Sequence, residues 1–290
     1  MLHRFHILLL SFLCPMLTIG MSACKKQDKS ELLINQAKEA AAKQEFQKAK
    51  LLIDSIRILY PDDYHKIQKG RHALYEVELG EQKRNRYYCD SVLKIRQADF
   101  PQKQKNFTYQ QNTAIESVGY YVHNEHVFHG NNTQRCYLQF KTDNEGRYFL
   151  TSYYCNTYPI EHSKIRLVAP DGSYCESLEV PNDGALNYRF RDDNLYYEIV
   201  CFNQKKLNKL MEFAHLHKDD NLKVVLVGKR KHQYPLRSKD LQIMLDGMEL
   251  SFVLSDIHRL LEESRLSQAK IQYLKQRIEQ VDSTTKKSSR

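Results

Sequence analysis

The chain has 290 residues, of which 41% are hydrophobic and 27% are charged, and its formal net charge is +9. This length leaves room for one large or two modest domains with real cores. The apolar segment near the start is too short for a membrane-spanning helix, and no second segment approaches the run of about 20 apolar residues that one needs. The basic residues are scattered along the chain, which favours a solvated basic surface over a dedicated polyanion site. We therefore expect no nucleic-acid partner.

The start of the chain has the organisation of an export signal. A short basic start precedes about a dozen mostly apolar residues at 7–17. The small residues Ser22 and Ala23, directly before Cys24, resemble the lipobox of bacterial lipoproteins, in which diacylglycerol is attached to the cysteine thiol. The resemblance implies a lipoprotein signal peptide at 1–23 and a mature chain tied to a membrane through lipidated Cys24. The alternative, an ordinary secretory signal with a chance cysteine, also places the folded chain outside the cytoplasm.

The residues after Cys24 are polar, and we expect residues 24–30 to form a flexible tether. In lipoproteins of two-membrane bacteria, an aspartate directly after the lipidated cysteine is typical of retention in the inner membrane. Lys25 takes that position here. The resemblance therefore implies an outer-membrane lipoprotein of the cell envelope.

The pattern of residues 31–99 predicts a helical domain. Two amphipathic helices, joined near residues 43–45, form a hairpin, and a longer helix follows. The offsets within the hairpin resemble one tetratricopeptide unit, and they involve Ala37, Phe46, Ala49, Ile53 and Pro61. No second copy follows at a period of about 34 residues. We therefore predict a single helix pair rather than a peptide-binding repeat array.

Two long helices are predicted on either side of the middle of the chain. One spans about residues 63–98 and has one narrow apolar seam. The other spans 239–282, and its apolar residues follow the three-four alternation of a coiled coil, interrupted only at Ser264 and Ser267. We predict that the two helices pack together and that seam positions left exposed accept a partner protein or a second copy. Residues 283–290 are predicted to be a disordered tail.

Residues 107–237 have the alternating pattern of a β domain. Short runs rich in tyrosine, valine, isoleucine and phenylalanine are separated by Asp-Gly and Glu-Gly turn signals. About eight strands are expected, at residues 119–123, 135–141, 147–154, 164–168, 173–179, 186–190, 196–202 and 222–228. A short helix is expected at 205–217. The predicted fold class is α+β, with an antiparallel β-sandwich-like domain inserted between long helices that pack as a helical hairpin or coiled coil.

Seven cysteines occur in the chain, and five remain once Cys14 is cleaved away and Cys24 is lipidated. Four of the five lie in the β domain, at Cys136, Cys155, Cys175 and Cys201. An exported protein permits disulfides, and four cysteines allow three pairings that the sequence does not separate. Free buried thiols are equally compatible with the pattern, because cysteine also serves as a small core residue.

Three histidines lie within seven residues, at His123, His126 and His129. Imidazoles a few residues apart are typical of zinc sites. Side chains alternate between the two faces of a strand, so His126 points away from the other two, and further ligands would have to come from elsewhere, such as Glu161 or His162. We therefore predict a polar strand end or loop and no metal site, in preference to a metal-dependent hydrolase.

The sequence contains no recognisable catalytic motif. It has no Gly-x-Ser-x-Gly elbow, no His-Glu-x-x-His and no glycine-rich phosphate loop. We predict a protein that is not an enzyme and that holds no cofactor.

Tyrosine is abundant in the predicted strands. Rigid amphipathic rings on an exposed sheet face bind glycans or peptides well, and ordinary packing within strands is the competing interpretation. Adjacent tyrosines must point to opposite faces of a sheet. The candidate ligand-binding residues are Tyr120, Tyr137, Tyr153, Tyr188 and Tyr196.

The order of these features looks like that of a group of uncharacterised bacterial envelope lipoproteins. The resemblance covers the lipobox, the helical hairpin, the terminal coil and three stretches of the β domain, 119–122, 150–155 and 159–165. It implies a location and an architecture, and no activity. We hypothesise a non-enzymatic, lipid-anchored scaffold or protein-interaction module. The alternative is a glycan- or peptide-binding lipoprotein that uses a tyrosine-rich sheet face.

Overall fold

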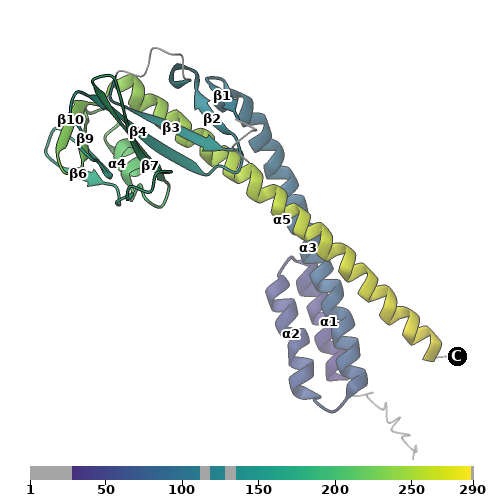
Figure 1. The fold of residues 1–290 in the computed structure, drawn as a ribbon. Helices are drawn as coiled ribbons and strands as arrows, with labels where there is room; N and C mark the ends of the chain where they lie inside the picture. Colours follow the sequence, from purple (N-terminus) through teal and green to yellow (C-terminus); the bar gives the residue numbers. More distant parts are fainter. Residues whose placement is uncertain (1–27, 112–117, 128–134, 289–290) are drawn as a thin grey trace, which may run out of the picture. The chain divides into compact units, whose positions relative to one another are not determined.

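The computed structural model describes residues 28–111, 118–127 and 135–288. The predicted lipidation site Cys24 and the third histidine of the cluster, His129, lie outside the described residues. The fold is α+β, as predicted, with long helices and two antiparallel sheets (Figure 1).

The first of two compact units, Met1–Val77, contains the predicted helical hairpin. Its helices are α1 (Lys29–Ala42), α2 (Phe46–Leu59) and the beginning of α3 (Tyr64–Gln104). Ala37 of α1 and Ala49 of α2 are both 0% exposed, and such small residues let two helices approach closely. The helix α1 begins at Lys29, inside the predicted tether, because the Asp28 side chain accepts a hydrogen bond from Ser30 N at 3.0 Å.

The second compact unit, Glu78–Arg290, contains an antiparallel pair of long helices, the remainder of α3 and α5 (Ser238–Ser288). Arg96 Nε lies 2.9 Å from Asp256 Oδ2, and Ser264 Oγ donates to Asp90 Oδ1 at 2.7 Å. These pairs confirm the predicted packing of the two helices. Ser264, which interrupts the apolar seam, is thereby matched with a polar partner. None of the helices in the described residues is apolar over enough of its length to cross a bilayer.

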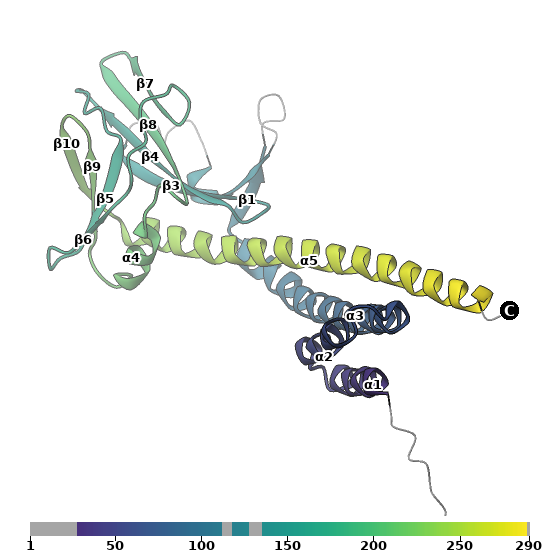
Figure 2. The same cartoon turned by 90° about the horizontal axis from the view of Figure 1, so that it is seen from below.

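Ten strands lie in the described part of the second unit. They are β1 (Phe107–Gln110), β2 (Tyr120–His123), β3 (Tyr137–Asp143), β4 (Tyr148–Asn156), β5 (Lys164–Val168), β6 (Tyr174–Glu176), β7 (Asn187–Asp192), β8 (Leu195–Asn203), β9 (Lys223–Val227) and β10 (Lys231–Pro235). A 3₁₀ turn, η1 (Asn124–His126), follows β2, and α4 (Leu210–Leu216) follows β8. One sheet has the strand order β1-β2-β3-β4-β8-β7, and the other has the order β10-β9-β5-β6 (Figure 2).

One apolar core is shared by the two sheets, α4 and the first turns of α5. Each of these contributes side chains that are 0% exposed, among them Leu138, Phe140, Leu150, Val200, Phe202, Leu167, Val224, Leu210 and Met244. The helix α5 contacts β3 closely, because a Cβ added at Gly247 would lie 2.3 Å from the Phe140 ring. We call the side of the six-stranded sheet that lines this core the inner face, and the opposite side the outer face.

The structure differs from the predicted elements mainly at their ends. The strands β1 and β10 were not predicted, because they are short edge strands with few apolar residues to produce an alternating pattern. The helix α3 continues past Pro101 to Gln104. The helix α5 continues to Ser288, so most of the predicted disordered tail is helical. There the hydroxyls of Ser283 and Thr284 both donate to Gln280 O and follow the helix rather than ending it.

Candidate functional site

Four of the five candidate tyrosines lie on the outer face of the six-stranded sheet. The strand register pairs Tyr137 with Tyr153, Tyr153 with Ile199, and Ile199 with Tyr188. Paired residues share a face, and these positions alternate with the core residues of the same strands. Tyr120 belongs to the same face, because its partner in β3 is Asp143. The structure thus brings Tyr120, Tyr137, Tyr153 and Tyr188 together on one surface.

The centre of this outer face is an aromatic stack that crosses two strands. The rings of Tyr137 and Tyr153 are 4.6 Å apart and nearly parallel, at 4°. The Tyr153 hydroxyl donates to Gln139 Oε1 at 3.2 Å. Burial raises the pKa of Tyr153 and of Tyr137, so both phenols stay neutral at physiological pH. These two rings are packed side chains, and they form one stack on this face.

The exposed rings lie at the β7 edge. The rings of Phe190 and Tyr197 stack at 4.8 Å and 7°, and Tyr188 lies 6.5 Å from Phe190 at 15°. Phe190 is 47% exposed and Tyr188 is 39% exposed. Because β7 is the last strand of the sheet, this second stack ends there. It ends with apolar ring surface in contact with water.

Two cations lie against other rings of the outer face. The Arg135 guanidinium is 4.8 Å from the centre of the Tyr137 ring, and Lys141 Nζ is 4.3 Å from that of Tyr120. Such contacts favour a fixed ring position. The outer face is therefore aromatic and cationic.

Tyr196 is the exception among the candidates, because it lies on the opposite side of β8. Its partner in β7 is Arg191, and the Arg191 guanidinium lies 5.2 Å from its ring. The next residue, Tyr197, takes the position on the outer face, and with Phe190 it was missed from the sequence. Alternation requires only that neighbouring residues point to opposite faces, so choosing between Tyr196 and Tyr197 needs the register between β4 and β8.

The inner face carries a buried polar network that the sequence did not reveal. Ser152 Oγ lies 2.7 Å from His162 Nε2, and His162 Nδ1 lies 2.8 Å from Glu198 Oε2. The Glu198 carboxylate also accepts hydrogen bonds from the backbone N–H groups of Ile160, Glu161 and His162 at 2.7–2.8 Å. Burial opposes ionisation of Glu198, but the His162 ring and these N–H groups outweigh it and lower its pKa to about 2.

The contacts of Ser152, His162 and Glu198 follow the order of a nucleophile, a base and an orienting carboxylate. Ser152 and His162 are 0% exposed and Glu198 is 1% exposed. A substrate reaches a nucleophile only through an opening, and Ser152 lies inside the core between the sheets. This arrangement joins β4, β8 and the segment before β5, and we interpret it as a structural network.

The described histidines of the predicted cluster have separate partners. His126 Nε2 lies 3.2 Å from Asp240 Oδ1, while His123 Nδ1 accepts a hydrogen bond from Glu125 N. His162 belongs to the inner network, and Glu161 pairs with Arg189 and Lys229. In the described part of the chain, no group of three or more His, Cys, Asp or Glu side chains is placed to hold a metal ion.

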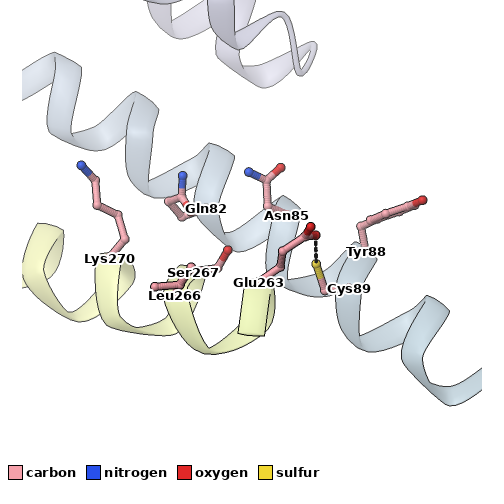
Figure 3. A pocket seen from close by; sticks show the side chains of 8 residues that line it. All are labelled: Gln82, Asn85, Tyr88, Cys89, Glu263, Leu266, Ser267 and Lys270. Atoms are coloured by element: carbon pink, nitrogen blue, oxygen red, sulfur yellow. Dashed lines mark hydrogen bonds between the residues drawn. The ribbon is translucent and has the colours of Figure 1, made fainter. Parts of the chain in front are cut away.

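A groove of about 600 Å³ lies between α3 and α5 within the second unit (Figure 3). Its lining residues are Gln82, Asn85, Tyr88, Cys89, Glu263, Leu266, Ser267 and Lys270. Glu263 and Cys89 point toward each other, with Sγ 3.6 Å from Oε2 (Figure 3). Burial raises the pKa of Cys89, which keeps its thiol protonated. The groove therefore holds an unreactive thiol between polar side chains.

The cysteines of the β domain form no disulfide with one another, since Cys136, Cys155, Cys175 and Cys201 are all free thiols.

Compared with known proteins, the chain matches no family model, no curated protein and no solved structure. The case for a function therefore depends on the residues and the geometry described above.

Proposed function

We propose that this chain is a non-catalytic, lipid-anchored lipoprotein of the bacterial envelope that acts as a protein-interaction module. Its binding surface is the outer face of the six-stranded sheet, at the β7 edge. The observation that carries the proposal is the exposed end of the aromatic stack, where Phe190 and Tyr188 are 47% and 39% exposed. Rigid aromatic side chains with a packed base supply contact area at low entropic cost, which is typical of binding surfaces.

The neighbouring strand β8 supports this proposal, because its Tyr197 ring holds the exposed Phe190 ring in place. Tyr197 stacks on Phe190, and Tyr153 stacks on Tyr137, each within 4.8 Å. The rings are therefore fixed before a partner arrives, which reduces the entropy lost on binding. The cations Arg135 and Lys141, which lie against the Tyr137 and Tyr120 rings of the same face, favour a partner that carries negative charge.

Site-specific photo-crosslinking tests this surface in the intact envelope. A photoreactive phenylalanine analogue at Phe190 is expected to crosslink to one partner protein. The same analogue at Tyr174, a 58% exposed tyrosine of the other sheet, is the matched control and is expected to give no product. Equal products at both positions, or none at Phe190, would overturn the proposal. A product that contains glycan and no protein would favour the glycan-binding alternative.

Lipid anchoring is supported by the lipobox-like residues 22–24 and is tested separately. When the full-length chain is expressed in a lipoprotein-processing bacterium with a labelled fatty acid, the label is expected on the wild-type chain. It is expected to be absent from Cys24→Ser. Mass spectrometry that finds an unmodified Cys24 in the mature natural protein would contradict the anchor and leave the sheet surface to be judged by the crosslinking.

A further inference from the structure

The backbone of β7 presents unpaired hydrogen-bonding groups at the sheet edge. Cys201 N donates a hydrogen bond to Leu186 O at 2.7 Å. This bond identifies the residues of β7 whose backbone groups are paired with β8. Since bonding alternates along an antiparallel pair, Tyr188 and Phe190 bond to β8, whereas Arg189 and Arg191 direct their N–H and C=O groups outward.

Asn187 confirms this alternation, because its backbone faces outward and is satisfied by a neighbouring turn. Its N–H donates to Asp183 Oδ1 at 3.1 Å, and its C=O accepts from Gly184 N at 3.1 Å. Beyond Asn187, no residue that the structure describes bonds to the outward groups of Arg189 or Arg191. The edge is therefore open over these two residues.

The aromatic stack ends at the same edge. Stacked rings of the outer face are 4.6–4.8 Å apart, which matches the usual separation of paired strands, about 4.8 Å. A strand added beside β7 would therefore bring its own side chain into stacking range of the exposed Phe190 ring. The same added strand would extend both the backbone hydrogen bonding of the sheet and the stack of rings.

The charges on the other side of β7 select the chemistry of that occupant. Arg189 and Lys229 share one carboxylate, Glu161, at 3.1 and 2.9 Å. Arg191 contacts Asp193 O and the Tyr196 ring, and no carboxylate of the described residues forms an ion pair with it. Residues placed opposite Arg189 and Arg191 would therefore be favoured if they were acidic.

The same charges disfavour a second copy of this chain at the edge. In the antiparallel β7–β7 pair that uses both open residues, Arg189 of each copy would lie directly opposite Arg191 of the other. Like charges directly opposite each other destabilise a strand pair.

We propose that β7 accepts an extended segment of a partner protein as an added antiparallel strand, with an apolar or aromatic residue opposite Phe190 and an acidic residue on each side of it. The partner's backbone bonds to Arg189 and Arg191, and its acidic side chains face their guanidinium groups. This inference rests on the proposed function and specifies what the interaction surface recognises.

A peptide titration of the detergent-solubilised full chain tests the strand addition. The probe is a short fluorescent peptide with a central Glu-Phe-Glu between threonines, followed by fluorescence anisotropy. It is expected to bind, and a peptide with central Lys-Phe-Lys is expected to bind at least about fivefold more weakly. N-methylation of the backbone at the two glutamates is expected to abolish binding, because those N–H groups bond to β7.

Three variants make the result specific to the edge. Arg191→Glu is expected to remove the preference for the glutamate peptide, because each peptide would then face one opposite and one like charge. Arg230→Glu, at an exposed arginine outside β7, is expected to leave the preference unchanged. Arg191→Pro removes an outward N–H that the sheet itself does not use, and is expected to abolish binding while the thermal unfolding midpoint stays close to that of the wild type. Binding that survives N-methylation and Arg191→Pro would overturn strand addition. Crosslinking from Phe190 would still judge the proposed function.

Discussion

The inner and outer faces of the six-stranded sheet both carry tyrosines and charged groups, but these groups have different partners. On the inner face, Glu198 accepts from three backbone N–H groups and contacts His162. On the outer face, the rings become more exposed toward β7, from Tyr137 at 6% to Phe190 at 47%. Buried polar groups that have all their hydrogen bonds stabilise the fold, whereas exposed apolar rings at a sheet edge are available to a partner.

The largest difference between the faces is expected from neighbouring residues of β8. Glu198→Ala leaves three buried N–H groups and the His162 ring without their acceptor, and is expected to lower the free energy of unfolding by about 3 to 5 kcal/mol. Tyr197→Ala, on the outer face, loses one aromatic stack and is expected to cost about 1 kcal/mol. Urea unfolding of both variants measures the contrast. Equal losses would show that the outer face is as structural as the inner one.

The inner network also predicts a dependence of stability on pH. The folded-state pKa of Glu198, about 2, is below the usual 4.5, so its contribution is complete above pH 4.5 and is lost as the pH falls toward 2. The difference in unfolding free energy between the wild type and Glu198→Gln is therefore expected to shrink over that range. A difference that stays constant from pH 6 to pH 2.5 would contradict the low pKa.

Adjacent tyrosines of β4 sharpen the comparison further. The Tyr154 hydroxyl donates to Tyr158 O at 2.6 Å on the inner side, and the Tyr153 hydroxyl donates to Gln139 Oε1 at 3.2 Å on the outer side. Tyr154→Phe is expected to cost about 1 kcal/mol and Tyr153→Phe about half of that. Thermal unfolding of the two single variants checks the order, and the reverse order would contradict the assignment of faces.

Only a small effect on stability is expected at the exposed end of the second stack. Tyr188→Ser combined with Phe190→Ser replaces rings that already contact water, so the unfolding free energy is expected to change by about 1 kcal/mol or less. The Glu-Phe-Glu peptide is expected to bind more weakly to this double variant, because the rings that would contact its phenylalanine are gone. A loss of stability as large as that of Glu198→Ala would mean that these rings are part of the core.

The sequence predicts the repeating parts of this fold well and the particular contacts less well. The apolar periodicity located α1, α2, the α3–α5 pair and most strands, because each element buries one regular face. Alternation also required Tyr153 and Tyr154 to point apart. The choice of Tyr196 over Tyr197 failed, since it depends on the β4–β8 register, which no local pattern encodes.

The inner network was beyond prediction for the same reason. Ser152, His162 and Glu198 come from three separate segments, and only the folded sheet brings His162 within 2.7 Å of Ser152 and 2.8 Å of Glu198. The open edge at Arg189 and Arg191 likewise depends on β7 being the last strand. Strand order is set by long-range pairing, whereas composition and periodicity report local structure.

Hydrogen exchange of the β7 backbone tests the central claim most directly, in native envelopes and in purified full-length chain. With a partner strand in place, the amides of Arg189 and Arg191 are expected to exchange more slowly in the envelope than in the purified chain. Those of β10, an edge of the other sheet, are expected to exchange equally in both. Equal exchange at β7, or equal slowing of both edges, would contradict a partner strand added at β7.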